Sequence, residues 1–358
     1  MTETRLGRGN RGRVVEFRMQ TPKVLLLLAL IGGATGSCEF LPLTAPSAHT
    51  PVASAPTLEL SNVLQITDDQ FLYRNPEWSP DGASIAVARN RSNQTPAGPS
   101  PFRWEIVLID LQTLESKSLS VGEDYSLTYP TWSPGGDQLA FIAYDGELNH
   151  LITYSIASGE WKDLGCKFCD FSTWQAPGNE IFAGALLGAG PGQSGEFGIV
   201  TVNPSSGDWL TERRIGEPYW GPFAVSPRGD IALLPDEECT GIWQLSIDSG
   251  ELIALVDAIN QEECDPQLSF DGTKLAYTTK DLPSIAPTSL VVSNADGSSP
   301  SALLNPTLAV YQIHDLTWSP DGSKIAFAYG LFSLTSPAVS TLYTVDVPPE
   351  LRPSALDS

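Results

Sequence analysis

Histidine and basic residues are scarce in this sequence. Only three histidines, His49, His150 and His314, occur among 358 residues, which leaves few of the imidazole ligands that zinc and other transition metals take. Lysine and arginine number 20 against 42 aspartates and glutamates, a formal net charge of −22. Because nucleic-acid phosphates attract basic side chains, this balance argues against a nucleic-acid partner. It allows a basic partner, a hard cation, or only the solubility that an exported protein needs.

Long apolar runs are also missing, apart from one short run near the start. Val24–Ile31 is unbroken apolar sequence, too short to cross a bilayer as a mature helix, and it follows a basic lead. Small residues at 32–37 then precede Cys38, and Met19 is an alternative start. This layout predicts that residues 1–37 are a signal peptide.

The same segment resembles the lipobox of bacterial lipoproteins, in which small residues precede a cysteine that is acylated and becomes the new N-terminus. Thr35 departs from that family, which usually has a larger aliphatic residue there. The resemblance implies a lipid anchor at Cys38 and a place in the bacterial cell envelope, on the extracytoplasmic side. The alternative is a soluble secreted or periplasmic protein cleaved near Ser37. Residues 38–58, rich in proline, alanine, serine and threonine, are typical of a flexible tether.

A tight turn followed by a short apolar strand recurs beyond the tether. In one copy Pro320 presets φ for a type I turn, Gly322 takes the left-handed position, and Ile325 and Phe327 share one face of the next strand. The copies start at Trp78, Trp132, Trp174, Val225, Leu268 and Trp318, at steps of 54, 42, 51, 43 and 50 residues. Such a period is that of a four-stranded propeller blade.

The strands expected around these turns predict an all-β fold, a six-bladed β-propeller of four-stranded blades over residues 59–348, with a tail at 349–358. Five blades are complete in sequence. The sixth lacks a fourth strand, because Pro348 and Pro349 cannot continue a central strand. We predict that the unpaired strand Val63–Thr67 supplies it, which closes the ring and protects both edges.

The repeat resembles that of TolB-like β-propellers. The resemblance rests on turns such as Trp318–Gly322, on the strand Ile325–Phe327 and on the third strand Thr341–Asp346. It covers Asn62–Val347 and implies the fold, with little about function. Related propellers precede serine peptidase domains, but this sequence contains no Gly-x-Ser-x-Gly nucleophile elbow.

In such a propeller the B–C and D–A loops share one face, and here that face carries the long loops. Long loops on a rigid scaffold are the usual place for binding. Aromatic and polar residues near the channel mouth suit a peptide or a sugar. The candidate ligand-binding residues are Arg74, Tyr73, Tyr125, Tyr129, Tyr219, Trp220, His314 and Asp315.

Four cysteines remain if Cys38 carries lipid, an even number in an oxidising compartment. We predict a bond between Cys239 and Cys264, on adjacent loops of one face, and a local bond between Cys166 and Cys169. A zinc site at the second pair is the alternative, and it needs two further ligands.

Two acidic clusters flank the predicted Cys239–Cys264 bond. They indicate either a calcium site, the one cofactor considered, or a pocket for a cationic group. Solvated loops of an acidic protein are the simpler interpretation. The residues concerned are Asp236, Glu237, Glu238, Glu262, Glu263 and Asp265.

Two functions follow from these features. The first is a monomeric, membrane-anchored propeller that binds an envelope protein, a peptide or a glycan as a scaffold module, without catalysis. The second is a lyase or hydrolase acting on a polysaccharide at the channel mouth. The resemblance implies several histidines and a metal for propeller lyases, so the scarcity of histidine favours the first.

Overall fold

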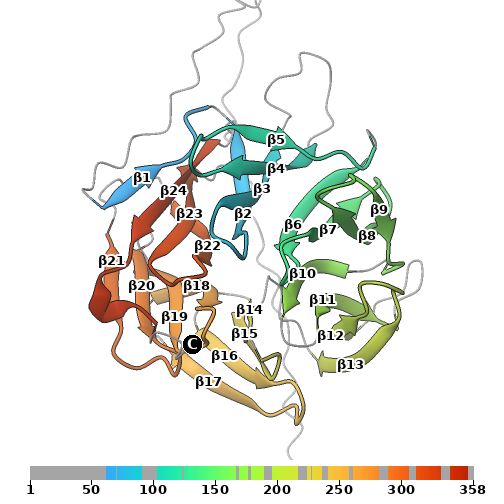
Figure 1. The fold of residues 1–358 in the computed structure, drawn as a ribbon. Helices are drawn as coiled ribbons and strands as arrows, with labels where there is room; N and C mark the ends of the chain where they lie inside the picture. The colour runs from blue at the N-terminus through green and yellow to red at the C-terminus, as the bar shows by residue number, and fades with distance from the viewer. Residues whose placement is uncertain are drawn as a thin grey trace, which may run out of the picture. The chain divides into compact units, whose positions relative to one another are not determined.

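A computed structural model of the protein shows six four-stranded antiparallel sheets arranged in a ring (Figure 1). The structure describes residues 62–69, 71–90, 103–122, 125–166, 169–175, 179–188, 196–216, 224–226, 228–235, 241–257, 261–281, 289–305, 312–331 and 339–353. The chain divides into two compact units, residues 1–50 and 51–358, and the described residues all belong to the second. In these ranges no helix combines the length and the apolar character needed to cross a membrane.

Each sheet is one blade, with its strands in the order A to D from the channel outward. Blade 1 contains β2 (Leu72–Trp78), β3 (Ser84–Asn90), β4 (Trp104–Asp110) and β5 (Ser116–Ser118). Blade 2 contains β6 (Ser126–Trp132), β7 (Gln138–Tyr144), β8 (Asn149–Ser155) and β9 (Trp161–Asp163). Blade 3 contains β10 (Cys169–Gln175), β11 (Glu180–Leu187), β12 (Glu196–Val202) and β13 (Trp209–Gly216).

The second half of the ring repeats this order. Blade 4 contains β14 (Ala224–Val225), β15 (Ile231–Pro235), β16 (Gly241–Ser246) and β17 (Leu252–Asp257). Blade 5 contains β18 (Gln261–Leu268), β19 (Lys274–Asp281), β20 (Ser289–Asn294) and β21 (Ser301–Leu304). Blade 6 contains β22 (Gln312–Trp318), β23 (Lys324–Leu331), β24 (Val339–Asp346) and the N-terminal β1 (Val63–Gln65). A short 3₁₀ helix, Pro349–Leu351, follows β24.

The predicted closure of the ring by an N-terminal strand is confirmed. β1 pairs antiparallel with β24, with Leu64 opposite Thr344, and the blue and red strands lie side by side in Figure 1. The contact continues past the strand, where the Ile66 amide donates to the Leu342 carbonyl at 2.8 Å. The Thr67 hydroxyl accepts the Leu342 amide at 3.0 Å. Both ends of the chain's repeat are therefore held in one sheet.

The recurring turn is held by its own serine and aspartate. In the first copy the Ser79 hydroxyl donates to Asp81 at 2.6 Å and accepts the Ser84 amide at 2.9 Å. The same two bonds recur at Ser319, with Asp321 and the Lys324 amide. A satisfied hydroxyl next to a left-handed glycine fixes the direction in which each B strand begins.

The hydrophobic core lies between blades. Each of six buried clusters joins two neighbouring blades, and a B strand contributes to both of its neighbours. On β3, Ile85 and Val87 pack toward blade 6, whereas Ala86 and Ala88 pack toward blade 2. Because successive side chains of a strand point to opposite faces, an unbroken apolar B strand is what a sheet buried on both sides requires.

Candidate functional site

Four of the inner A strands have a β-bulge three residues before the leading position of their turn. The pairing register shifts there in blades 1, 2, 5 and 6. The residues at the bulge have left-handed backbones, with φ of 50° at Asn75, 52° at Tyr129, 52° at Asp265 and 56° at Asp315. In three of the four strands proline follows, and its missing N–H suits a break in the ladder. The bulge reverses the alternation of side chains.

The inner strands surround a cavity of about 360 Å³. Its lining forms three tiers along the A strands. The bulge tier comprises Asn75, Tyr129, Phe171, Asp265 and Asp315, nearest the D–A loops. The middle tier comprises Glu77, Thr131, Thr173, Ala224, Gln267 and Thr317, one residue before each leading position. The turn tier comprises Pro80, Pro134, Phe270 and Pro320, at the A–B turns.

Two carboxyl groups meet in the bulge tier. The Asp315 amide donates to Asp265 Oδ2 at 3.2 Å, and Asn75 Nδ2 donates to Asp315 Oδ1 at 3.0 Å. His314 Nδ1 lies 2.6 Å from Asp315 Oδ2. Burial and the neighbouring charge of Asp315 raise the pKa of Asp265, while His314 and Arg74 act against that rise. One site therefore holds two carboxyl groups that titrate apart.

Asp315 is the partner that stays ionised. Burial alone raises its pKa, but the charge and hydrogen bond of His314, and then the charge of Arg74, bring the pKa of Asp315 below its usual range. The sequence prediction placed Arg74, His314 and Asp315 at one rim. The hydrogen bond and these electrostatic effects bring the three together.

A third carboxyl group, Glu77, lies in the middle tier. Thr317 donates its hydroxyl to Glu77 Oε2 at 3.3 Å. Burial raises the pKa of Glu77 to about 7, and within the described part of the chain this hydrogen bond opposes the rise. Glu77 thus changes its charge near neutral pH inside the cavity.

Aromatic rings occupy the arc that faces these acids. Tyr129 from β6 and Phe171 from β10 lie edge to face, with their ring centroids 6.2 Å apart. Burial, followed by the charge of Asp315, raises the pKa of Tyr129 to about 12, so its hydroxyl stays protonated. The cavity is consequently two-sided, with aromatic rings from blades 2 and 3 and carboxyl groups from blades 5, 6 and 1.

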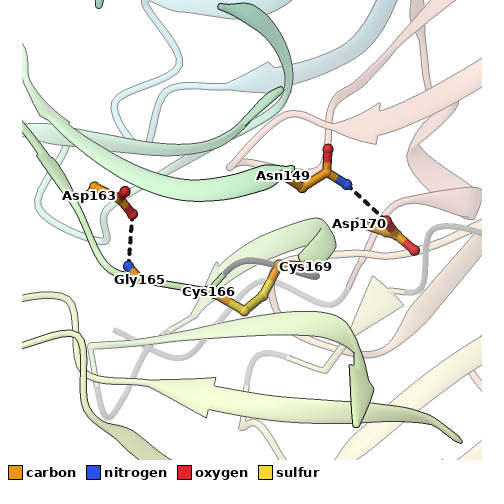
Figure 2. The surroundings of a disulfide bond; sticks show 6 residues. All are labelled: Asn149, Asp163, Gly165, Cys166, Cys169 and Asp170. Atoms are coloured by element: carbon orange, nitrogen blue, oxygen red, sulfur yellow. Dashed lines mark hydrogen bonds between the residues drawn. A yellow bond between two sulfur atoms is a disulfide. The ribbon is translucent and has the colours of Figure 1, made fainter. Parts of the chain in front are cut away.

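The predicted bond between Cys166 and Cys169 is present, immediately before and at the start of β10 (Figure 2). Their Cα atoms are 5.7 Å apart, an ordinary separation for a disulfide. The next residue, Asp170, accepts a hydrogen bond from Asn149 Nδ2 at 3.0 Å, and burial raises the pKa of Asp170. No group of three potential metal ligands occurs within the described ranges.

Two predicted ligand-binding tyrosines lie away from the cavity. Tyr73 is 1% exposed in the core between blades 1 and 6, and its hydroxyl donates to Asp69 at 2.6 Å. Tyr125 packs edge to face with His150 and Trp161 of blade 2. Neither residue is among those lining the cavity.

The predicted acidic site is only partly described. The sequence placed Glu262, Glu263 and Cys264 in a D–A loop, but the structure places them in strand β18, and their side chains lie outside the described residues. Asp265 faces the cavity through its bulge. Tyr219, Trp220, Asp236, Glu237, Glu238, Cys239 and Cys38 also lie outside the described residues.

Sequence reasoning missed Asn75 and Glu77 as cavity residues, and it named Asp265 only as part of an acidic cluster. The sequence contains a signal that could have identified these residues, because each lies at a fixed number of residues before its turn. Positions three and one before the leading residue line the cavity in every described blade with such a residue. Comparing those offsets between copies would have exposed the acids as departures from the threonines and aromatics of other blades.

The fold is shared with solved propellers of low sequence identity. A TolB from Agrobacterium tumefaciens is 15% identical, with 80% of this chain and 97% of that chain covered and a TM-score of 0.57. A TolB from Acinetobacter baumannii is 13% identical, with 78% and 63% covered and a TM-score of 0.50, so this chain spans less than two thirds of that protein. An oligogalacturonate lyase in complex with manganese is 14% identical, with 81% and 94% covered and a TM-score of 0.51.

These likenesses show the fold: the chain has the six-bladed propeller architecture of TolB and of TolB-like proteins. No protein-family model matches the chain, and no curated protein matches it.

Proposed function

We propose that this protein is an extracytoplasmic binding or scaffold module, anchored by lipid at Cys38, that takes a partner through the face of the B–C and D–A loops. The observation that carries the proposal is the cavity of about 360 Å³ along the inner strands. Its titratable groups Asp265 and Asp315 lie in the tier nearest that face. A concave site with a few convergent polar groups and shifted pKa values is the usual signature of binding.

The partner classes considered are an envelope protein, a peptide and a glycan. The ring suits a partner of any of these three classes, because the strands that form its cavity wall are packed on both sides and are therefore rigid. The two faces of the ring differ in how much their residues vary from blade to blade. The A–B turns of blades 1 and 6 repeat one hydrogen-bonding pattern, whereas the D–A end carries the groups that differ between blades.

Site-directed crosslinking in cells tests the choice of face. A photoreactive residue at Asp145, in the B–C loop of blade 2, is compared with one at Gln112, in the C–D turn of blade 1. Both positions are exposed. We expect a discrete crosslinked species from position 145 and none from position 112. Crosslinks of equal yield from both positions would refute the choice of face.

The lipid anchor has its own test. A Cys38→Ala variant should lose the incorporation of a palmitate analogue and leave the membrane fraction. Equal labelling of the variant would place any acyl group elsewhere.

An enzyme acting on polysaccharide is the second candidate, and one observation favours it. Asp265 and Asp315 are adjacent carboxyl groups whose pKa values move in opposite directions, the arrangement from which acid and base roles arise. Incubation with oligogalacturonide and with neutral polysaccharide, followed by assay of reducing ends and of unsaturated product, tests it. Turnover that Asp265→Asn abolishes would replace the binding proposal, and no turnover would end the enzyme candidate.

A further inference from the structure

The charged groups around the cavity do not balance. Glu77, Asp265 and Asp315 are three acids in its lining. Arg74 and His314 act on Asp265 and Asp315. No basic residue among the described ones acts on Glu77, whose pKa responds there to burial and to the Thr317 hydroxyl. A buried carboxylate without a counter-charge is costly, and a bound cation relieves that cost.

The opposite wall suits an apolar stem. Tyr129 and Phe171 present aromatic rings in the bulge tier, and Pro134 of blade 2 continues this wall in the turn tier. Aromatic faces attract ammonium groups as well as alkyl chains. A cavity of about 360 Å³ exceeds the roughly 150 Å³ that holds one benzene ring, so a side chain of lysine length fits by volume.

A buried donor in the same lining is also unmatched. Trp78 lines the cavity and is 4% exposed, and its indole N–H has no acceptor among the described residues. The equivalent N–H of Trp132 donates to the Glu77 carbonyl at 3.2 Å, and that of Trp318 donates to the Gln267 carbonyl at 3.1 Å. Buried donors are normally satisfied, so Trp78 marks a place for an acceptor that the described chain does not provide.

We propose that the cavity binds a primary ammonium group on an apolar stem next to an amide carbonyl, the chemistry of a lysine residue with its side chain and its backbone carbonyl. The ammonium group lies on the arc of Glu77, Asp265 and Asp315, and the stem packs on Tyr129 and Phe171. This inference rests on the proposed binding role and names the ligand class of that site. The source is either a lysine of a peptide or a free lysine derivative.

Calorimetry with matched probes tests the proposal. The probes are Nα-acetyl-lysine methylamide, the norleucine analogue that keeps the stem without the ammonium group, an acetylated and amidated Ala-Lys-Ala peptide, and a neutral trisaccharide of glucose. We expect both lysine probes to bind and the other two not to bind. Tighter binding of the tripeptide assigns a peptide source, and equal binding assigns a free amine.

Isosteric variants place the binding in the cavity. Glu77→Gln and Asp265→Asn should each weaken binding of the lysine probe by about tenfold or more, since each removes a charged hydrogen-bond partner. Glu115→Gln removes the same charge from an exposed turn of blade 1 and should leave affinity unchanged. A cooperative thermal unfolding transition, at a midpoint no lower than that of the native protein, confirms that the variants fold. Unchanged affinity in both cavity variants would overturn the proposal.

The pH dependence gives a second readout. Glu77 faces Thr317 of β22, while Asp265 faces Asp315 and His314 of β22 and Arg74 of β2. Because Glu77 ionises at about 7, affinity should rise from about pH 5.5 to about pH 7.5 in the native protein and rise less in Glu77→Gln.

Several results would refute this inference without refuting the broader binding proposal. Binding of norleucine as tight as that of lysine, binding of the trisaccharide only, or no binding at all would each overturn it. Persistent crosslinking from position 145 would then leave the broader binding proposal standing.

Discussion

Glu77 is the clearest case of an acidic side chain in an environment that disfavours its charge. It occupies a position where other blades have threonine, alanine or glutamine, and it keeps a titratable group in a cavity wall. Its hydrogen bond from Thr317 at 3.3 Å is too weak to offset the loss of water, which is why burial dominates its pKa. A group of this kind weakens the fold when it ionises, and such a cost is commonly kept at a binding site.

Glu77→Gln should stabilise the protein at alkaline pH. The folded state raises the pKa of Glu77 from 4.5 to about 7. The ionisation of Glu77 therefore lowers the unfolding free energy of the native protein as pH rises between those values, and the full loss is present above them. The gain expected for the variant is about 2 kcal/mol at about pH 8, discounted for partial exposure, and near zero below about pH 4.5.

Urea unfolding at the two pH values measures this gain. The control is Glu115→Gln, whose native side chain is exposed. A gain that is the same at both pH values would show that Glu77 is not ionising in the folded protein.

At the scale of the strand, the repeat predicted the fold because its signal is local. Pro320, Gly322 and the following apolar residues fix a turn and the face of a strand without reference to other blades. The count of blades, the strand order and the closing strand then followed from the number of copies and from the prolines after Val347.

The site was harder to predict because the A strand is bulged. Simple alternation gives no indication that Asn75, rather than Tyr73, lines the cavity, and one inserted residue exchanges the two faces. A left-handed tyrosine at Tyr129 has no strong sequence signature, since that conformation is uncommon for a bulky residue. Arg74, His314 and Asp315 were predicted because the sequence placed them near the D–A loops, at the rim of the channel mouth.

The disulfide before β10 should stabilise the protein modestly. Cys166 and Cys169 enclose a short loop, so a Cys166→Ser, Cys169→Ser double variant should lose about 2 kcal/mol of unfolding free energy in the chain-entropy account. Both cysteines are buried in the core between blades 2 and 3. Reducing agent should lower the stability of the native protein to that of the variant and leave the variant unaffected.

Denaturant unfolding with and without dithiothreitol makes this comparison. The affinity of the variant for Nα-acetyl-lysine methylamide then reports whether β10 still positions Phe171 in the cavity wall. A native protein that is insensitive to reductant would mean that the bond does not form or is inaccessible.

At the scale of the molecule, stability comes from blade-to-blade contact. Since each buried cluster joins two neighbours, opening the ring at one junction exposes one buried face of each of the two blades beside it. The junction of blades 6 and 1 differs from the other junctions because the chain passes from β1, the N-terminal strand that completes blade 6, directly into β2 of blade 1. Ile66 belongs to the cluster that fills this junction, together with Tyr73, Trp78 and Leu342.

Two apolar residues of the closing segment provide a matched test of that junction. Ile66 is 6% exposed and packs between the blades, whereas Leu64 is 56% exposed on β1. Ile66→Ala should cost about 2 to 4 kcal/mol of unfolding free energy, because it leaves a cavity in a core shared by the chain's two ends. Leu64→Ala should cost less than about 0.5 kcal/mol, as surface substitutions do.

The same pair of variants reports on the sheet edge. If closure fails, the edge of β24 is exposed and invites pairing with another chain, so Ile66→Ala should self-associate at high concentration while Leu64→Ala stays monomeric. Equilibrium unfolding and light scattering measure the two effects. Equal stability of the variants would show that blade packing alone holds the ring and that β1 contributes only its backbone hydrogen bonds.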